Sequence, residues 1–153
     1  MHHGANELPT ETHEGKTIRV VAGTFLGLTS PVDSGWDTLF ADVALDAGAK
    51  LPLDAGTEER AIYLVSGEVD IAGDRFEAGR LLVFKPGDRI TVTAGSDAHL
   101  VLLGGAAMDG PRHIWWNFVS SRKERIEQAK ADWKLRRFDS VPGDESEFIP
   151  LPV

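Results

Sequence analysis

The feature that most constrains this sequence is a series of short apolar stretches separated by glycine- and proline-rich turns. The series runs from Ile18 to Leu103, and turn signals such as Ser66-Gly67 recur about every 8 to 12 residues. Within RAIYLVSGEVDIAGD, the alternation places Tyr63 on one face of a strand and Ile62 and Leu64 on the other. No stretch with helical periodicity interrupts the series, so the pattern predicts an all-β sandwich or barrel and argues against a parallel βαβ fold.

Composition limits the class of protein. The 153 residues are enough for one domain with a core, and the net charge of −8 argues against binding to nucleic acid. No run of about 18 apolar residues predicts a membrane span, and there are no cysteines, so we expect a cytoplasmic protein. Residues 1–15 are polar and predict a flexible leader, which leaves 16–153 as the folded domain.

The character of the sequence changes after Gly105. HIWWNFV alternates like a strand that is buried on both faces, with one face on the barrel interior. Ser121 and Glu124 have capping-box spacing, so a helix is predicted over about 121–137, packed on the outside of the barrel. The last residues, FDSVPGDESEFIPLPV, predict an extended strap that docks on the domain.

Several segments together resemble a known family. YLVSGEVDIAGDRFEAGRLLVFKPGDRITVTAG resembles the two sequence blocks of a cupin, which is a small jelly-roll β-barrel. RVVAGTFLGLTSPV, LLGGAAMDGPRHIWWNFVSSRKERIEQAKADW and FDSVPGDESEFIPLP resemble the C-terminal half of pirin-family proteins. The resemblance, over about residues 16–152, implies a single cupin barrel with one C-terminal helix.

The resemblance also implies where a metal would lie. Pirins contain two cupins, and three histidines and a glutamate hold iron in the N-terminal one, whereas this chain resembles the other. The cupin ligand pattern falls on Leu53, Ala55, Glu59 and Val92, and only Glu59 can bind a metal. We therefore expect no metal cofactor, and the quercetin oxidation that the resemblance would suggest lacks its metal centre.

Candidate site residues follow from residue chemistry. Trp36, Tyr63, Phe84 and His99 are candidates to line a pocket in the barrel mouth, although core packing is the simpler interpretation for Phe84. Glu59, His99 and His113 are the candidate ligands if a metal is bound in an unorthodox way. Glu68 and Asp70 share a strand face, which more often marks a solvated surface than a proton-transfer pair.

The predicted helix carries seven Lys or Arg and three Asp or Glu between Arg122 and Arg137. This basic surface could bind an acidic partner, or it could be an ordinary solvated face.

Three functions remain open from the sequence. The first is a non-catalytic pirin-like cupin that binds a small organic ligand or a protein partner. The second is a quercetinase-like dioxygenase with unorthodox metal ligands, and the third is one half of a split two-cupin pirin. A homodimer would replace the contact between the two barrels of a two-cupin protein by a symmetric one.

Overall fold

The computed structural model describes residues 3–152 and contains two larger antiparallel sheets, two small two-stranded sheets and one α-helix. The chain divides into two compact units, Met1–Ala107 and Met108–Val153, and each is described by itself below. No helix among the described residues is long and apolar enough to cross a membrane.

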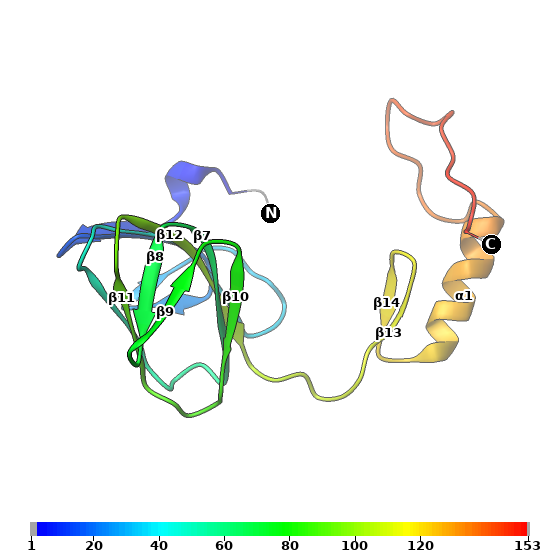
Figure 1. Ribbon diagram of the computed structural model, residues 1–153. Helices are drawn as coiled ribbons and strands as arrows, with labels where there is room; N and C mark the ends of the chain where they lie inside the picture. The colour runs from blue at the N-terminus through cyan, green and yellow to red at the C-terminus, as the bar shows by residue number, and fades with distance from the viewer. Residues whose placement is uncertain (1–2, 153) are drawn as a thin grey trace. The chain divides into compact units, whose positions relative to one another are not determined.

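The first unit is a jelly-roll sandwich of antiparallel strands (Figure 1). The six-stranded sheet has the order β1-β2-β5-β12-β7-β10, and the four-stranded sheet has the order β6-β11-β8-β9. The ten strands of these sheets are β1 (Thr10–His13), β2 (Lys16–Ala22), β5 (Thr38–Leu45), β6 (Lys50–Leu53), β7 (Glu59–Ser66), β8 (Glu68–Ile71), β9 (Asp74–Glu77), β10 (Arg80–Phe84), β11 (Ile90–Ala94) and β12 (Ala98–Gly105). A short hairpin, β3 (Thr24–Phe25) and β4 (Leu28–Thr29), forms a small sheet of its own. The predicted all-β cupin-type fold is confirmed.

The core lies between the two sheets and is aliphatic. Ile62 and Leu64 of β7 are fully buried, and so are Val69 of β8 and Val92 of β11 from the opposite sheet. Burying a Val, Leu or Ile side chain contributes about 1.5–3 kcal/mol each, so this cluster is the main source of stability. The inward and outward faces of β7 follow the alternation predicted from the sequence.

One buried side chain in this unit is charged. Arg60 at the start of β7 is 3% exposed, and its guanidinium donates hydrogen bonds to backbone carbonyl oxygens. The acceptors lie in two loops: Leu53 (3.1 Å) and Asp54 after β6, and Lys85 (3.3 Å) and Asp88 (2.6 Å) between β10 and β11. Arg60 therefore ties these two loops together at one end of the sandwich.

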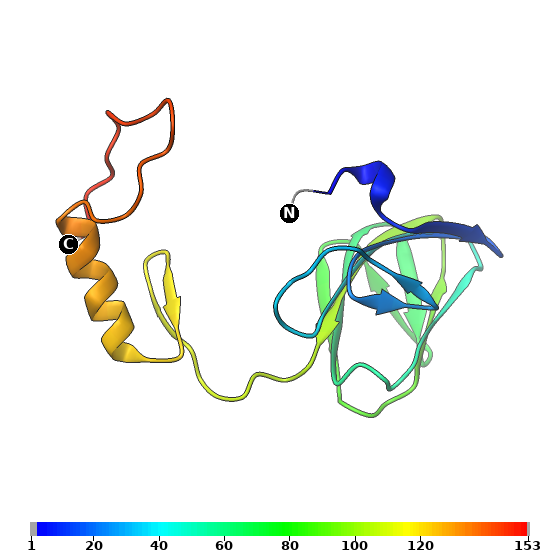
Figure 2. The ribbon, with the colours of Figure 1, turned by 180° about the vertical axis from the view of Figure 1, so that it is seen from behind.

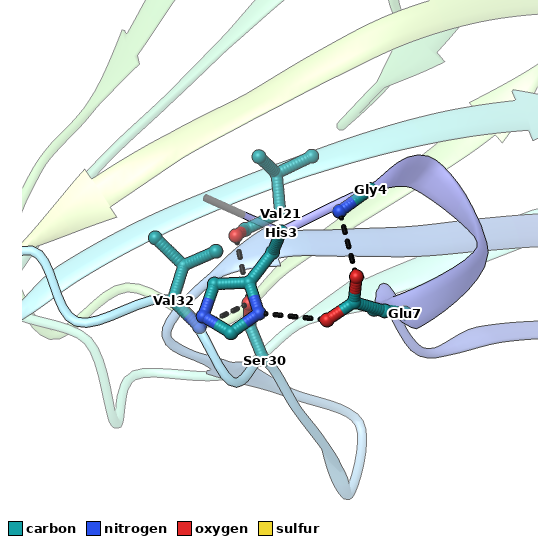
Figure 3. A network of polar contacts seen from close by, with 6 residues as sticks. All are labelled: His3, Gly4, Glu7, Val21, Ser30 and Val32. Atoms are coloured by element: carbon teal, nitrogen blue, oxygen red, sulfur yellow. Dashed lines mark hydrogen bonds and ion pairs between the residues drawn. The ribbon is translucent and has the colours of Figure 1, made fainter. Parts of the chain in front are cut away.

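The segment predicted to be a flexible leader contains a short turn of helix and a strand. A 3₁₀ turn, η1 (Ala5–Glu7), precedes β1, and β1 pairs with β2 at the edge of the larger sheet (Figure 2). Glu7 accepts hydrogen bonds from the backbone N–H of Gly4 and from the His3 ring, both at 3.0 Å (Figure 3). The polar composition that predicted a leader is that of an exposed edge strand; Met1 and His2 lie outside the described residues.

A second polar network lies beside this turn (Figure 3). The Ser30 hydroxyl donates to the carbonyl of Val21 at 2.7 Å and accepts from the N–H of Val32 at 3.1 Å. This side chain therefore fastens the end of β2 to the loop that follows β4.

The second unit contains a hairpin and a helix. The predicted strand HIWWNFV is instead a hairpin, β13 (His113–Trp115) and β14 (Phe118–Ser120), and it belongs to neither sheet of the sandwich. Trp116 occupies the turn with a φ of 51°, a left-handed conformation that residues with large side chains rarely adopt. The alternation of the sequence therefore did not predict this turn.

The helix α1 (Lys123–Lys134) is shorter than the predicted 121–137. Its N-cap residue is Arg122 without a side-chain cap, so the predicted capping box of Ser121 and Glu124 is wrong. Arg136 has a φ of 52°, which ends the helix before the predicted boundary. Ile126 is the helix's buried residue, and α1 packs on β13 and β14.

Candidate functional site

The metal positions of a cupin are the first place to look for a site. Leu53 on β6 and Val92 on β11 are 1% and 0% exposed and belong to the aliphatic core. Ala55 and Glu59 are exposed. Methyl groups offer no donor atoms to iron, so these four residues do not fit a cupin metal.

The weaker metal candidates do not come together either. Glu59 pairs with Gly105 and His99 pairs with Ser66, so the two side chains lie at opposite ends of the antiparallel β7–β12 pair. At about 3.3 Å per residue they are roughly 20 Å apart. His113 lies in the second unit, on β13. Within residues 3–152, no group of three His, Cys, Asp or Glu side chains is placed to hold an ion.

The four pocket candidates do not line one barrel mouth. Tyr63 and His99 point outward from β7 and β12, because their neighbours in the strand, Leu64 and Leu100, fill the core. Phe84 packs against the core from β10, which supports core packing for that residue. Trp36 lies in a loop, 43% exposed, with its indole N–H donating to the carbonyl of Ala106 at 3.2 Å.

His99 has a partner that sequence reasoning missed. Its Nε2 atom lies 2.5 Å from Oδ1 of Asp42 on β5, and both side chains are about two-fifths exposed. The pair joins strands that are adjacent in the sheet but far apart in the sequence, so the sequence alone did not indicate that these two side chains meet. A solvent-accessible pair of this kind contributes about 0–1 kcal/mol.

The outer face of the six-stranded sheet carries an apolar surface next to this pair. Four of its side chains are between 42% and 74% exposed: Tyr63, Val65, Leu81 and Val83. Phe40, Ala61, Val101 and Leu103 are half-buried neighbours on the same face. We call these eight residues the outer-face patch.

The acidic pair Glu68 and Asp70 has structural partners. Glu68 Oε2 lies 3.3 Å from the Arg75 guanidinium, and Asp70 accepts a hydrogen bond from the N–H of Gly73 at 3.1 Å. Both contacts lie within the β8–β9 hairpin, in agreement with a solvated strand surface.

The second unit contains half of the chain's Phe, Trp and Tyr rings, six of twelve, and they lie close together. Trp133 on α1 contacts the rings of Trp116, Phe118, Phe138 and Phe148 at centroid distances between 5.1 and 6.1 Å. Its indole N–H donates to the carbonyl of Ile149 at 2.8 Å, so the C-terminal strap docks on this helix. The strap and the end of α1 enclose a cleft of about 420 Å³.

Aromatic rings and carboxylates line this cleft together. Trp133, Phe138 and Phe148 supply the rings, and Asp144 and Glu147 are among the acidic residues. Arg136, also in the lining, stacks on the Phe148 ring at 4.4 Å. Aromatic rings beside carboxylates are suited to binding an organic cation. Arg136, however, already covers one face of the Phe148 ring, on which such a cation would stack.

Two ion pairs link charges on α1 and at its end. Lys130 Nζ lies 2.7 Å from Glu127 Oε1 and 4.5 Å from the centre of the Trp115 ring. The hydrogen bond from Lys130 lowers the pKa of Glu127 below its ordinary value. Asp132 pairs with Arg137, just after the helix, at 3.1 Å. This pairing favours the interpretation of a solvated helix face.

Comparison with known proteins decides the family. The profile of the Pirin C-terminal cupin domain matches residues 40–139. The chain belongs to the pirin family. A pirin-like protein of Caulobacter vibrioides is 40% identical over 151 residues, which is 99% of this chain and 52% of that protein. Human pirin is 32% identical over 138 residues, which is 85% of this chain and 47% of pirin.

The solved structures agree on the fold. A quercetin 2,3-dioxygenase from Acinetobacter baumannii superposes with a TM-score of 0.81 over 95% of this chain and 50% of that protein, at 24% identity. At that identity the likeness establishes the fold only. The chain spans about half the length of the curated pirins that it matches.

Proposed function

We propose that this pirin-family cupin works by binding a protein partner and that its barrel has no catalytic metal of its own. The observation that carries the proposal is the burial of Leu53 and Val92, at 1% and 0% exposure, in two of the four ligand positions of a cupin. Changing these side chains to ligands would open the aliphatic core. The exposed outer-face patch supports protein contact as the alternative use of the fold.

Metal content of the purified, dialysed protein tests the first part of the proposal. Plasma mass spectrometry is expected to find less than about a tenth of an equivalent of iron, nickel, copper or zinc. Near-stoichiometric metal would overturn the proposal. The Glu59→Gln variant then reports whether that metal occupies the cupin position or another site, such as the histidines near the N-terminus.

A restored ligand set provides the positive control. The variant Leu53→His/Ala55→His/Val92→His, with Glu59 kept, places three imidazoles and a carboxylate at the cupin positions. If the variant folds, we expect it to bind iron or nickel where the native chain does not. A folded variant that still binds no metal would show that these positions are not the site.

A second candidate function is one half of a two-cupin pirin assembled from separate chains. It is favoured by the match of residues 40–139 to the C-terminal cupin domain of pirins, since pirins contain a second cupin. A second cupin chain that copurifies in a fixed ratio, and carries the metal, would support it.

A further inference from the structure

We propose that two copies of this chain associate face to face through the outer-face patch, about a two-fold axis. The inference rests on the proposed function, because it names the partner that the proposed protein contact takes. It concerns the outward surface of β12, β7 and β10, three neighbouring strands at one side of the larger sheet (Figure 1).

The first argument is that this part of the sheet is apolar on both faces. On β7, Ile62 and Leu64 face the core, while Ala61, Tyr63 and Val65 face outward. An antiparallel sheet with one solvated face normally alternates apolar with polar residues. Apolar residues on both faces indicate that both faces are covered in the functional form.

The second argument is that the patch is continuous across the strands. The register aligns one outward row of four residues across β5, β12, β7 and β10: Phe40, Leu103, Ala61 and Val83. The next outward row consists of Asp42, Val101, Tyr63 and Leu81. Three of the four residues in this second row are therefore apolar, and Asp42 ends it on the β5 side.

The third argument is charge, and it favours a second copy as the occupant. With a net charge of −8, two chains repel one another over most orientations. The eight patch residues include no carboxylate. Asp42, which ends one row, is paired with His99 at 2.5 Å, and the exposed Glu59 lies at the border, two residues before Ala61 on β7. Arg19 is the residue opposite Asp42 on β2, so the polar border carries both signs. A two-fold axis would bring this neutral surface onto itself without opposing like charges at its centre.

The arrangement also fits the anatomy of a protein interface. The apolar residues Tyr63 on β7 and Leu81 and Val83 on the edge strand β10 are bordered, on the β5 side of the patch, by the polar group of Arg19, Asp42 and His99. Aromatic and aliphatic residues at the centre with charged residues at the rim are typical of such contacts.

The test measures the association of the full chain by sedimentation velocity across the micromolar range. We expect a monomer–dimer equilibrium, and we expect Val83→Lys to raise the dimer dissociation constant at least about tenfold, because it places a charge within the apolar patch at its most exposed residue. Val83 is 74% exposed, so the variant should keep the native melting temperature.

The matched control is Val119→Lys, the same substitution at a strand residue of the second unit that is 62% exposed. It should leave the dissociation constant unchanged. Loss of association in Val119→Lys but not in Val83→Lys would place the contact elsewhere and overturn the inference.

A second measurement does not depend on a destabilising charge. The chain contains no cysteine, so Leu81→Cys and Val119→Cys each supply a single thiol. A short bismaleimide should link two Leu81→Cys chains more efficiently than two Val119→Cys chains. Three results would each overturn the inference: equal linking in both variants, a native chain that is monomeric at every concentration tested, or a patch occupied by a different cupin chain. None of these results changes the metal content, which tests the proposed function separately.

Discussion

Arg60 shows how one side chain can organise the end of a sandwich. Its guanidinium is 3% exposed and is bound by carbonyl oxygens, without a carboxylate partner among its hydrogen bonds. Its Nε atom has no hydrogen-bond partner among the described residues. The planar guanidinium has several N–H donors and can hydrogen-bond to two loops at once, which a lysine ammonium cannot do in the same geometry.

We expect Arg60→Ala to lower the free energy of unfolding by about 2–4 kcal/mol, because the loop carbonyls lose charged hydrogen bonds. Arg60→Lys should lose roughly half as much. Urea denaturation measures both values. Arg80→Ala, at an exposed position on β10, is the control and should stay within about 0.5 kcal/mol of the native chain.

Glu7 provides a pH-dependent contact at the same scale. The hydrogen bond from the Gly4 backbone, followed by that from the His3 ring, lowers the pKa of the Glu7 carboxyl below its ordinary value. Its contribution to stability is therefore complete above the unfolded-state pKa and is lost as the pH falls through the lower, folded-state pKa.

An NMR titration of the Glu7 side chain should give a midpoint below that of a glutamate in an unstructured peptide. His3→Ala should recover only part of the difference, because the larger contribution comes from the Gly4 backbone. Full recovery in His3→Ala would contradict this order of causes.

At the scale of elements, α1 serves as a support for the hairpin and the strap. Trp133 contacts rings from both, and its hydrogen bond to Ile149 fixes the position of the strap. The helix has a single buried residue, Ile126, so these aromatic contacts provide most of its packing.

Trp133→Phe should retain most of the ring contacts but lose the hydrogen bond to the strap. We expect amide exchange in residues 138–152 to accelerate roughly five- to tenfold, which corresponds to about 1 kcal/mol. Hydrogen exchange with mass spectrometry measures it. Trp36→Phe removes a similar indole bond in the first unit and should leave exchange in the strap unchanged.

Local patterns predicted the sandwich well and the second unit poorly. Strand alternation is a local property, so Ile62 and Leu64 could be assigned to one face and Tyr63 to the other from their neighbours alone. The turn at Trp116 requires a φ of 51° in a residue that no turn rule favours, so the hairpin appeared as one strand. The pairing of His99 with Asp42 depends on which strands lie side by side, and a single sequence does not contain that information.

For the candidate site, the sequence could predict the chemistry of individual side chains but not which of them lie together. Leu53 and Val92 could be recognised as unable to bind metal, because their side chains have no donor atoms. Tyr63 could not be assigned to a pocket or to an outer surface without knowing which face of β7 is the core.

At the scale of the whole molecule, the two units differ in how much core they bury. Among residues 3–152, all the buried hydrophobic residues except Ile126 lie in the first unit. Units of about 50 residues with little buried apolar area are marginal on their own.

A chain that ends at Ala107 should therefore retain a cooperative thermal transition and well-dispersed amide resonances. The segment 108–153 alone should give the narrow dispersion of an unfolded peptide. Circular dichroism and a two-dimensional amide spectrum distinguish these cases. A folded isolated segment would mean that the aromatic rings around Trp133 are sufficient without further support.

The position of β12 between β5 and β7 has a consequence for biosynthesis. β5 and β7 each leave an edge unpaired until residues 98–105 are added, although both strands are translated much earlier. At a translation rate of about 5–20 residues per second, these strand edges remain unpaired for seconds while the chain is still on the ribosome. During that interval the nascent chain exposes the same strands that the finished sheet buries at its centre, so translation speed between Ser66 and Ala98 should influence the yield of soluble protein.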